Sequence, residues 1–383
     1  MPTEEIAIAR PPANSSLHPD SLPDFAPARA VLNEAIRQHA LPGAAWGVLH
    51  QGNILALEAA GRFTYDPASP AVDPATIYDL ASVTKVVATT AAAMLLHDRG
   101  LFDLDTRLGD ILPAFVIGGQ PGSGKIRVTL RTLLAHSSGL PGYVKFFETC
   151  ATPDALLRAA LQLPLEAKPG ARTEYSDPGY ILLGKAIEVV AGESLDAFCA
   201  REIFAPLGLA STQFCPPAAA RNAIPPTEND TGFRRRIIQG EVQDENASVL
   251  GGVAGHAGVF SSVPDLLRFA QCILDRGRTA AGAQLFRPET IDLFATPHAT
   301  PDGNTRALGW DVPTPPSASG RHFGPRSIGH LGYAGTSLWI DPDPSLAIVL
   351  LTNRTWPDRA SDAIRQVRPA FHDAVVDALH PAS

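Results

Sequence analysis

The chain has 383 residues, of which 45% are hydrophobic and 18% charged, and its formal net charge is -8 from 31 basic and 39 acidic residues. This length can build a sizeable core in one large domain or in two intimately joined ones. The only dense basic run is Arg234-Arg235-Arg236, which we expect to be a solvated loop. The charge balance therefore argues against a nucleic-acid-binding surface, and no apolar run approaches a transmembrane span.

The N-terminus and the cysteines bear on the cellular compartment. Residues 1–24 are rich in Pro and Ser, are predicted to be poorly ordered, and contain no apolar segment of a signal peptide. Cys150, Cys199, Cys215 and Cys272 form neither a CxxC pair nor a zinc pattern, so we interpret them as free thiols. A cytoplasmic location is expected, or a periplasmic or secreted one if a signal was removed.

The first predicted elements are a helix and a hairpin. Residues 26–43 have the pattern of an amphipathic helix that is ended by Pro42-Gly43. Residues 44–62 predict two strands around the turn Gln51-Gly52-Asn53. The middle of the chain, roughly residues 79–250, is predicted to be mostly helical, with proline-rich loops at 216–226.

The last third of the chain returns to strands. Residues 336–354 predict a hairpin with its turn at 341–344, and residues 359–379 predict a closing helix. Strands at both ends with helices between them favour one sheet that is built from both termini. The helical region would then be an insertion that packs beside this sheet.

The stretch ASVTKVVATTAAAMLLHDRG places Ser82 in front of an alanine-rich predicted helix that ends at Gly100. Lys85 is three residues after Ser82, so both side chains point to the same side of a helix. A plain N-cap and a solvated lysine would also fit this spacing. However, a cation in the first turn opposes the helix dipole, and the segment between Lys85 and His97 is free of acidic and basic residues. A lysine on such a buried helix requires a reason.

Two further stretches add to this pair. Residues 175–177 (YSD) precede a helix predicted from about Tyr180, and residues 330–332 (HLG) lie at the start of a predicted strand. Taken separately, the tyrosine is compatible with simple packing and the histidine with a structural hydrogen bond. Together with Ser-x-x-Lys, and in this order, they resemble the three motifs of the serine β-lactamase-like superfamily. That group includes penicillin-binding DD-peptidases, class C β-lactamases and family VIII carboxylesterases.

The resemblance covers roughly residues 26–378, because the segments LFDLDTRLGDILP, VTLRTLLAHSSGLPGY, GGVAGHAGVFSSVPDLLRFAQ, LGWD and VLLTNR are also similar to the family. It implies an α+β fold in which an antiparallel sheet is flanked by terminal helices and an all-helical domain is inserted. Residues 25–78 and 251–383 would form the sheet domain and residues 79–250 the mainly helical domain, with the active site at their junction.

The chemistry implied by these motifs is acyl transfer through a serine. Ser82 would be the nucleophile that forms an acyl-enzyme, and Lys85 and Tyr175 would share its proton as one coupled network. Desolvation can lower the pKa of a lysine far enough for base work. The backbone N–H of Ser82 is a natural oxyanion donor. The resemblance places a second donor at the N–H of Tyr333, on the strand after the third motif, where Gly332 would let substrate lie close.

Two residues depart from the family pattern. His330 stands where β-lactamases have a lysine, and it can hold a substrate carboxylate only when it is protonated. This favours neutral esters or amides over β-lactams and peptides with a free C-terminus. Asp177 stands where the family usually has asparagine, and its carboxylate would keep Lys85 charged, which makes Tyr175 the better candidate base. A simple helix cap is the alternative role for Asp177.

The sequence therefore predicts a serine hydrolase that acts on a small ester or amide and resembles a carboxylesterase. An amidase or DD-peptidase on cell-wall-derived peptides, a β-lactamase, and a non-catalytic binding or sensor module on the same fold are the alternatives. Asp244, Glu245, Asn246 and His256 either line the cleft or form a loop with its own hydrogen bonds. No metal or organic cofactor is implied, no nucleic-acid partner and no membrane span are expected, and the oligomeric state is left open.

Overall fold

The computed structural model describes residues 23–117, 124–297, 301 and 306–380. The N-terminal segment that was predicted to be poorly ordered lies outside this part, apart from its last two residues. All four cysteines are free thiols, as expected, and only Cys215 is exposed. No helix in these ranges is both long and apolar enough to cross a membrane.

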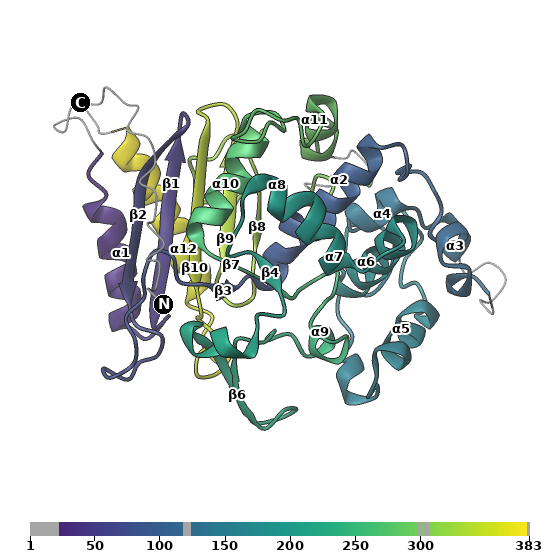
Figure 1. Cartoon of the computed structure of the whole chain (residues 1–383), viewed down its shortest axis with the longest axis horizontal. Coiled ribbons are helices and arrows are strands. Elements are labelled where there is room, and N and C mark those ends of the chain that lie inside the picture. The colour runs from purple at the N-terminus through teal and green to yellow at the C-terminus, as the bar shows by residue number, and fades with distance from the viewer. Residues whose placement is uncertain (1–22, 118–123, 298–300, 302–305, 381–383) are drawn as a thin grey trace, which may run out of the picture.

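The central feature is a five-stranded antiparallel sheet in the order β2-β1-β10-β9-β8 (Figure 1). The strands are β1 Gly43–His50, β2 Asn53–Gly61, β8 Ile328–Leu331, β9 Ser337–Asp341 and β10 Leu346–Thr352. Both predicted hairpins are confirmed as β1–β2 and β9–β10. Strand β1 pairs with β10 from the other end of the chain, so the sheet is built from both termini as expected.

The two faces of the sheet are covered by different helices. Trp46 and Val48 of β1 point into a core with α1 (Ala26–Arg37) and α12 (Ile364–Leu379), whereas the neighbouring positions face the rest of the molecule. On that second side α10 (Val263–Leu274) lies close to the sheet (Figure 1), because a Cβ on Gly47 would meet its side chains at 2.7 and 2.8 Å.

Helix α1 ends at Arg37 and does not reach the predicted stop at Pro42-Gly43. His39 takes a left-handed conformation (φ 57°), so the chain leaves the helix before the proline. The tertiary path toward β1 therefore ends the helix earlier than the sequence signal does.

Residues 79–250 contain most of the helices, but the segments around them also form short strands. These helices are α2 Ala91–Asp98, α3 Leu108–Ile111, α4 Leu130–Leu134, α5 Pro153–Gln162, α6 Asp177–Ala191, α7 Leu195–Cys199, α8 Ala205–Leu207 and α9 Glu245–Val249, and α11 Pro288–Ala295 follows α10. Short strands also form a three-stranded sheet (β3 Tyr78–Asp79, β4 Gln213–Phe214, β7 Val259–Ser261) and a hairpin (β5 Pro226–Asp230, β6 Arg236–Gln239). Strands this short carry too little alternation to be predicted.

Candidate active site

The segment with Ser82 is not the continuous α-helix that its propensity predicts. Ser82 lies in a short 3-10 turn, Ala81–Val83, which is followed by the π-helical segment Lys85–Thr90 and only then by α2. Ala81 is left-handed, with φ 47°. Such π-helical segments are uncommon and frequent at functional sites. The Nζ of Lys85 nonetheless lies 2.9 Å from the Oγ of Ser82, so the expected contact between the two side chains is present.

Lys85 is a fully buried lysine whose ammonium group is held from three sides. Its Nζ donates to Ser82 Oγ and, at 3.1 Å, to the backbone carbonyl of His256, and it lies 2.7 Å from the carboxylate of Asp177. Burial alone would lower the pKa of Lys85, but the negative charge of Asp177 and its hydrogen bond raise it above its usual value. The raised pKa of Lys85 favours its ammonium form at neutral pH.

Asp177 is the first residue of α6 and not its cap. The helix begins three residues earlier than predicted, because Ser176 takes the N-cap position and accepts a hydrogen bond of 3.0 Å from the N–H of Gly179. The alternative of a simple capping role for Asp177 is therefore wrong. Its carboxylate pairs with Lys85.

Tyr175 is enclosed by polar and aromatic groups. Its ring stacks on His136 with centroids 4.6 Å apart, and the guanidinium of Arg306 lies 5.1 Å from its ring centroid. The Nζ of Lys85 lies 4.8 Å from the centroid of its ring, and Tyr175 lines the same pocket as Ser82. Burial raises the pKa of Tyr175, and although Lys85 opposes this, the pKa stays above its usual value. The phenol is therefore the resting form at neutral pH.

His330 lies inside β8, not at the start of a strand, and is buried. Its Nδ1 lies 2.8 Å from the carbonyl of Leu331, and burial, with Lys85 nearby, lowers its pKa well below the usual value. Histidine at this position is therefore neutral and is not among the residues that line the pocket over Ser82. An anchoring role toward a substrate carboxylate is not what this placement offers.

The rest of the third motif also differs from expectation. Tyr333 lies in the turn between β8 and β9, not on a strand, and its half-exposed side chain lines the pocket. A Cβ on Gly332 would lie 2.4 Å from the carbonyl oxygen of Leu80 and 2.0 Å from the Oγ1 of Thr336. The absence of a side chain at Gly332 therefore makes room for the backbone carbonyl of Leu80, two residues before Ser82, and for the hydroxyl of Thr336.

Ser82, Tyr175 and Asp177 lie at the wall of one pocket of about 520 Å³. It is lined by Ala81, Ser82, Tyr143, Lys145, Phe147, Tyr175, Asp177, Gln243, Asp244, Glu245, Ala257, Tyr333 and Arg359. The aromatic residues Tyr143 and Phe147 were missed, although Tyr143 is the last residue of the family-like segment VTLRTLLAHSSGLPGY and Phe147 follows it by four residues. Nothing in the sequence pattern marks Arg359.

The polar residues near position 250 divide between the two expected roles. Asp244 lines the pocket, but it also caps α9 through the N–H of Ala247 and contacts the Nε2 of His256 at 2.9 Å. Glu245 lines the pocket and pairs with Arg359 at 2.7 Å. Asn246 instead supports the segment of the pocket wall that carries Phe147, because its side chain hydrogen-bonds to the backbone of residues 144 and 147.

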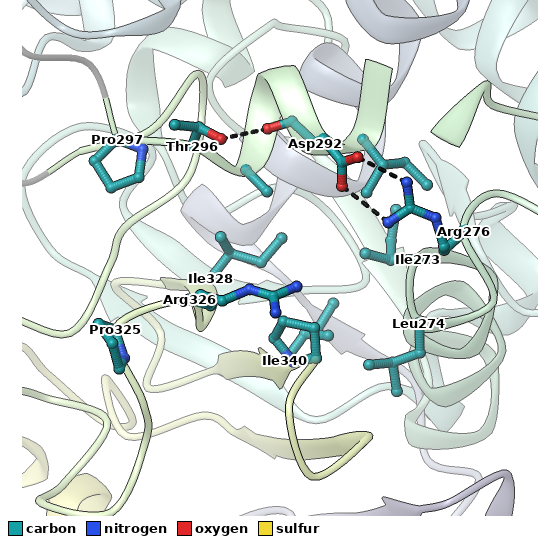
Figure 2. A pocket seen from close by; sticks show the side chains of 13 residues that line it. Ile273, Leu274, Arg276, Asp292, Thr296, Pro297, Pro325, Arg326, Ile328 and Ile340 are labelled. Atoms are coloured by element: carbon teal, nitrogen blue, oxygen red, sulfur yellow. Dashed lines mark hydrogen bonds and ion pairs between the residues drawn. The ribbon is translucent and has the colours of Figure 1, made fainter. Parts of the chain in front are cut away.

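A second pocket, of about 360 Å³, lies between α10, α11 and the sheet edge (Figure 2). Ile273, Ile328 and Ile340 form part of its wall, and Arg276 pairs with Asp292 at its side. In the described part of the chain no group of three or more His, Cys, Asp or Glu residues could hold a metal ion.

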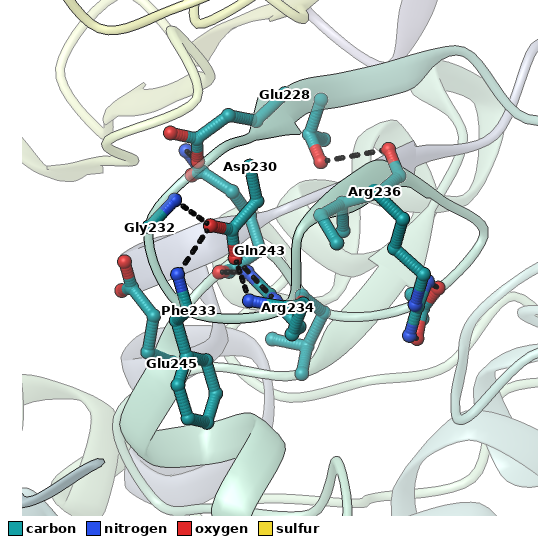
Figure 3. A network of polar contacts seen from close by, with 12 residues as sticks. Glu228, Asp230, Gly232, Phe233, Arg234, Arg236, Gln243 and Glu245 are labelled. Atoms are coloured by element: carbon teal, nitrogen blue, oxygen red, sulfur yellow. Dashed lines mark hydrogen bonds and ion pairs between the residues drawn. The ribbon is translucent and has the colours of Figure 1, made fainter. Parts of the chain in front are cut away.

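The basic run is only partly the solvated loop that was expected. Arg235 and Arg236 are exposed, but the side chain of Arg234 is only 8% exposed and pairs with Asp230 at 2.9 Å (Figure 3). It also donates to the carbonyls of Val242 and Gln243, beside the pocket. A buried arginine that satisfies backbone acceptors is structural and cannot be told from a surface charge by composition.

Comparison with known proteins agrees with these features. The Beta-lactamase family model matches residues 28–370. An N-acetylmuramyl-L-alanine amidase of Bacillus subtilis is 34% identical over 349 residues, which cover 82% of this chain and 77% of that protein. A putative D-alanyl-D-alanine carboxypeptidase of Escherichia coli K12 is 34% identical over 304 residues, covering 73% of this chain and 69% of that protein.

Solved structures show the same fold at lower identity. EstCE1, described as a hydrolase with promiscuous acyltransferase activity, superposes with a TM-score of 0.72 at 22% identity, covering 91% of this chain and 97% of that one. The octameric penicillin-binding protein homologue from Pyrococcus abyssi gives a TM-score of 0.72 at 23% identity, covering 92% and 77%.

Proposed function

The chain belongs to the beta-lactamase family of serine hydrolases, and from this premise we propose that it hydrolyses small neutral esters or amides through an acyl-enzyme on Ser82. The observation that carries the proposal is the 2.9 Å contact of Ser82 with the buried Lys85, whose Nζ also lies near the ring of Tyr175, at a pocket large enough for a small substrate that Ser82 and Tyr175 both line.

In the proposed reaction Lys85 acts as a fixed ammonium and Tyr175 as the proton carrier. The phenolate of Tyr175 takes the proton of Ser82 as the hydroxyl attacks the carbonyl, and the phenol then returns a proton to the leaving group. Lys85 favours the phenolate electrostatically, whereas burial opposes it. Activity should therefore rise with pH through the neutral and mildly alkaline range.

The oxyanion would be bound by backbone donors. The N–H of Tyr333 takes part in no hydrogen bond with any described residue, and Tyr333 lines the same pocket as Ser82. This supports its proposed role as the second donor, with the N–H of Ser82 as the first.

The charges around the pocket favour a neutral substrate. Of the basic residues that line the pocket, Arg359 pairs with Glu228 and Glu245 and Lys145 with Glu148, and Lys85 beside Ser82 pairs with Asp177. Lys85 and Arg359 cannot hold a free carboxylate without giving up partners that are largely buried, whereas the Lys145 pair is exposed. This argues against β-lactams and against peptides with a free C-terminus.

A second candidate is an amidase on cell-wall-derived peptides. It is favoured by the 34% identity to the Bacillus subtilis amidase over 82% of this chain. A non-catalytic sensor module is the alternative of another class, and labelling of Ser82 separates it from both enzymes.

The test is a substrate panel of short-chain p-nitrophenyl esters, D-Ala-D-Ala peptides, a muramyl-L-alanine amide and nitrocefin, measured on the wild type and on Ser82→Ala. We expect esters to outpace nitrocefin by a wide margin and the intact mass to increase by one phosphonyl group after treatment with a fluorophosphonate. Nitrocefin turnover equal to that of the best ester would defeat the preference. An unlabelled, inactive wild type would defeat the hydrolase itself.

A further inference from the structure

A buried carboxylate lies directly beside the turn that carries Ser82. Asp79 ends strand β3 and is 1% exposed. Its Oδ1 accepts the backbone N–H of Ala81 at 2.8 Å, and its Oδ2 accepts the backbone N–H of Gln243 at 2.7 Å. Ala81 and Gln243 both line the pocket. Each oxygen of one carboxylate thus holds a different segment of the pocket wall.

The turn needs such support because its backbone is strained. Ala81 has a positive φ of 47°, which a residue with a Cβ adopts at a cost in energy. Its neighbour Leu80 is held by a hydrogen bond from its N–H to the carbonyl of Val259 and by another from the hydroxyl of Thr336 to its carbonyl, both 2.9 Å. Asp79 adds an ionisable group to these contacts.

The other end of the link is itself anchored. The buried guanidinium of Arg234 donates to the backbone carbonyls of Val242 and Gln243 at 2.7 and 2.5 Å, and Figure 3 shows it beside Gln243. From this arrangement, and resting on the proposed function, we infer that Asp79 is a positioning residue that orients Ser82 for attack by tying its turn to the anchored wall at Gln243. The link requires both carboxylate oxygens as acceptors.

Protonation would break the link. A protonated carboxyl group carries its proton on one oxygen, which is then a poorer acceptor for the N–H that faces it. Burial raises the pKa of Asp79 to about 6, Asp244 adds to this rise, and the two N–H groups and Arg234 oppose it. Asp244 and Arg234 are the charged groups with the largest effects on this pKa. Ser82 should therefore be well oriented above about pH 6 and poorly oriented below it.

The test compares wild type with Asp79→Asn, whose amide group turns one acceptor into a donor. The rate of phosphonylation of Ser82 by a fluorophosphonate and kcat/KM on one p-nitrophenyl ester are measured from pH 4.5 to 8.5. We expect wild type to exceed the variant by about tenfold to a hundredfold above pH 7, since small misplacements of reacting groups cost this much. The ratio should shrink toward one below about pH 6, where wild-type Asp79 is protonated.

The ratio of the two rates cancels the titration of Tyr175, which both proteins share. A ratio that does not change with pH, or one near unity at pH 8, would overturn the inference. Asp265→Asn is the matched control, because Asp265 is also buried and accepts a backbone N–H, from Ser211 at 2.7 Å, but does not line this pocket. Its ratio should be near one at every pH, with circular dichroism confirming that all variants are folded.

If Asp79→Asn does not fold, the variant Asp79→Glu tests the inference instead. It keeps a carboxylate but displaces it, so the ratio of wild-type to variant rate should vary with pH between pH 5 and 7. A constant ratio would contradict the inference. Failure to label Ser82 in wild type would instead sink the proposed hydrolase, so the two failures are distinguishable.

Discussion

The two largest pockets described above differ in what surrounds them. Over Ser82, Lys85 is fully buried and the side chain of Asp177 is 15% exposed. In the second pocket, between α10, α11 and the sheet edge, the paired side chains of Arg276 and Asp292 are 52% and 56% exposed. Both pockets have apolar walls and room for a small molecule, but charged groups are withdrawn from water only in the first.

This contrast shows which property marks the reactive site. An exposed ion pair contributes little and perturbs its groups little. A buried pair shifts the pKa values of its neighbours, as Asp177 does for Lys85, and holds them in one geometry. Pocket size alone would not separate the two places.

The largest effect on the reactive site is expected from removing the predicted nucleophile, Ser82. Ser82→Ala should lower kcat by on the order of a thousandfold or more while the protein stays folded, because it removes the hydroxyl that contacts Lys85 at the pocket. Ester hydrolysis and circular dichroism measure the two parts of this prediction. Near-normal turnover by a folded variant would remove the mechanism.

The next largest effect concerns the partners of Ser82. Lys85→Ala and Tyr175→Phe should each lower kcat/KM by about a hundredfold or more. The double variant should be little worse than the poorer single one, since coupled residues are not additive. Steady-state kinetics on one ester test this, and fully multiplicative losses would show two independent roles.

Asp177→Asn should leave an active enzyme with a shifted pH profile. Asp177 raises the pKa of Lys85 and also that of Tyr175, so removing its charge lowers both. Activity requires the phenolate of Tyr175 beside the ammonium of Lys85, so both the rising and the falling limb of the pH profile should move to lower pH. The falling limb should move by about one to three pH units. Profiles of kcat/KM from pH 6 to 10 measure the shift, and superimposable profiles would return Asp177 to a purely structural role.

The smallest effect is expected in the second pocket. Arg276→Ala removes its exposed ion pair and should leave kcat/KM and the pH profile unchanged, with only a small change in Tm. The ester assay and thermal unfolding check this. A clear loss of hydrolysis would mean that the second pocket communicates with Ser82, and the contrast drawn above would fail.

The secondary structure was predicted correctly where apolar runs flank clear turn residues. The β1–β2 and β9–β10 hairpins carry clear turn residues between apolar runs, and the structure confirms them. Helix ends were less predictable. Helix α6 starts where it does because Ser176 caps it by accepting the N–H of Gly179. Helix α1 ends where it does because His39 takes a left-handed backbone conformation. Both features depend on the path of the chain beyond the helix.

For the candidate site, the sequence by itself determined the residue types and their order: Ser82 and Lys85 at helical spacing, then Tyr175 with Asp177, then the glycine-bearing third motif. Only the tertiary structure decided which of these groups meet. It pairs Asp177 with Lys85, buries His330 away from the pocket, fills the space at Gly332 with the chain at Leu80, and brings Arg359 to the wall. The physical reason is that the charge state of a group depends on its burial and its neighbours, which are distant along the chain and are set by packing.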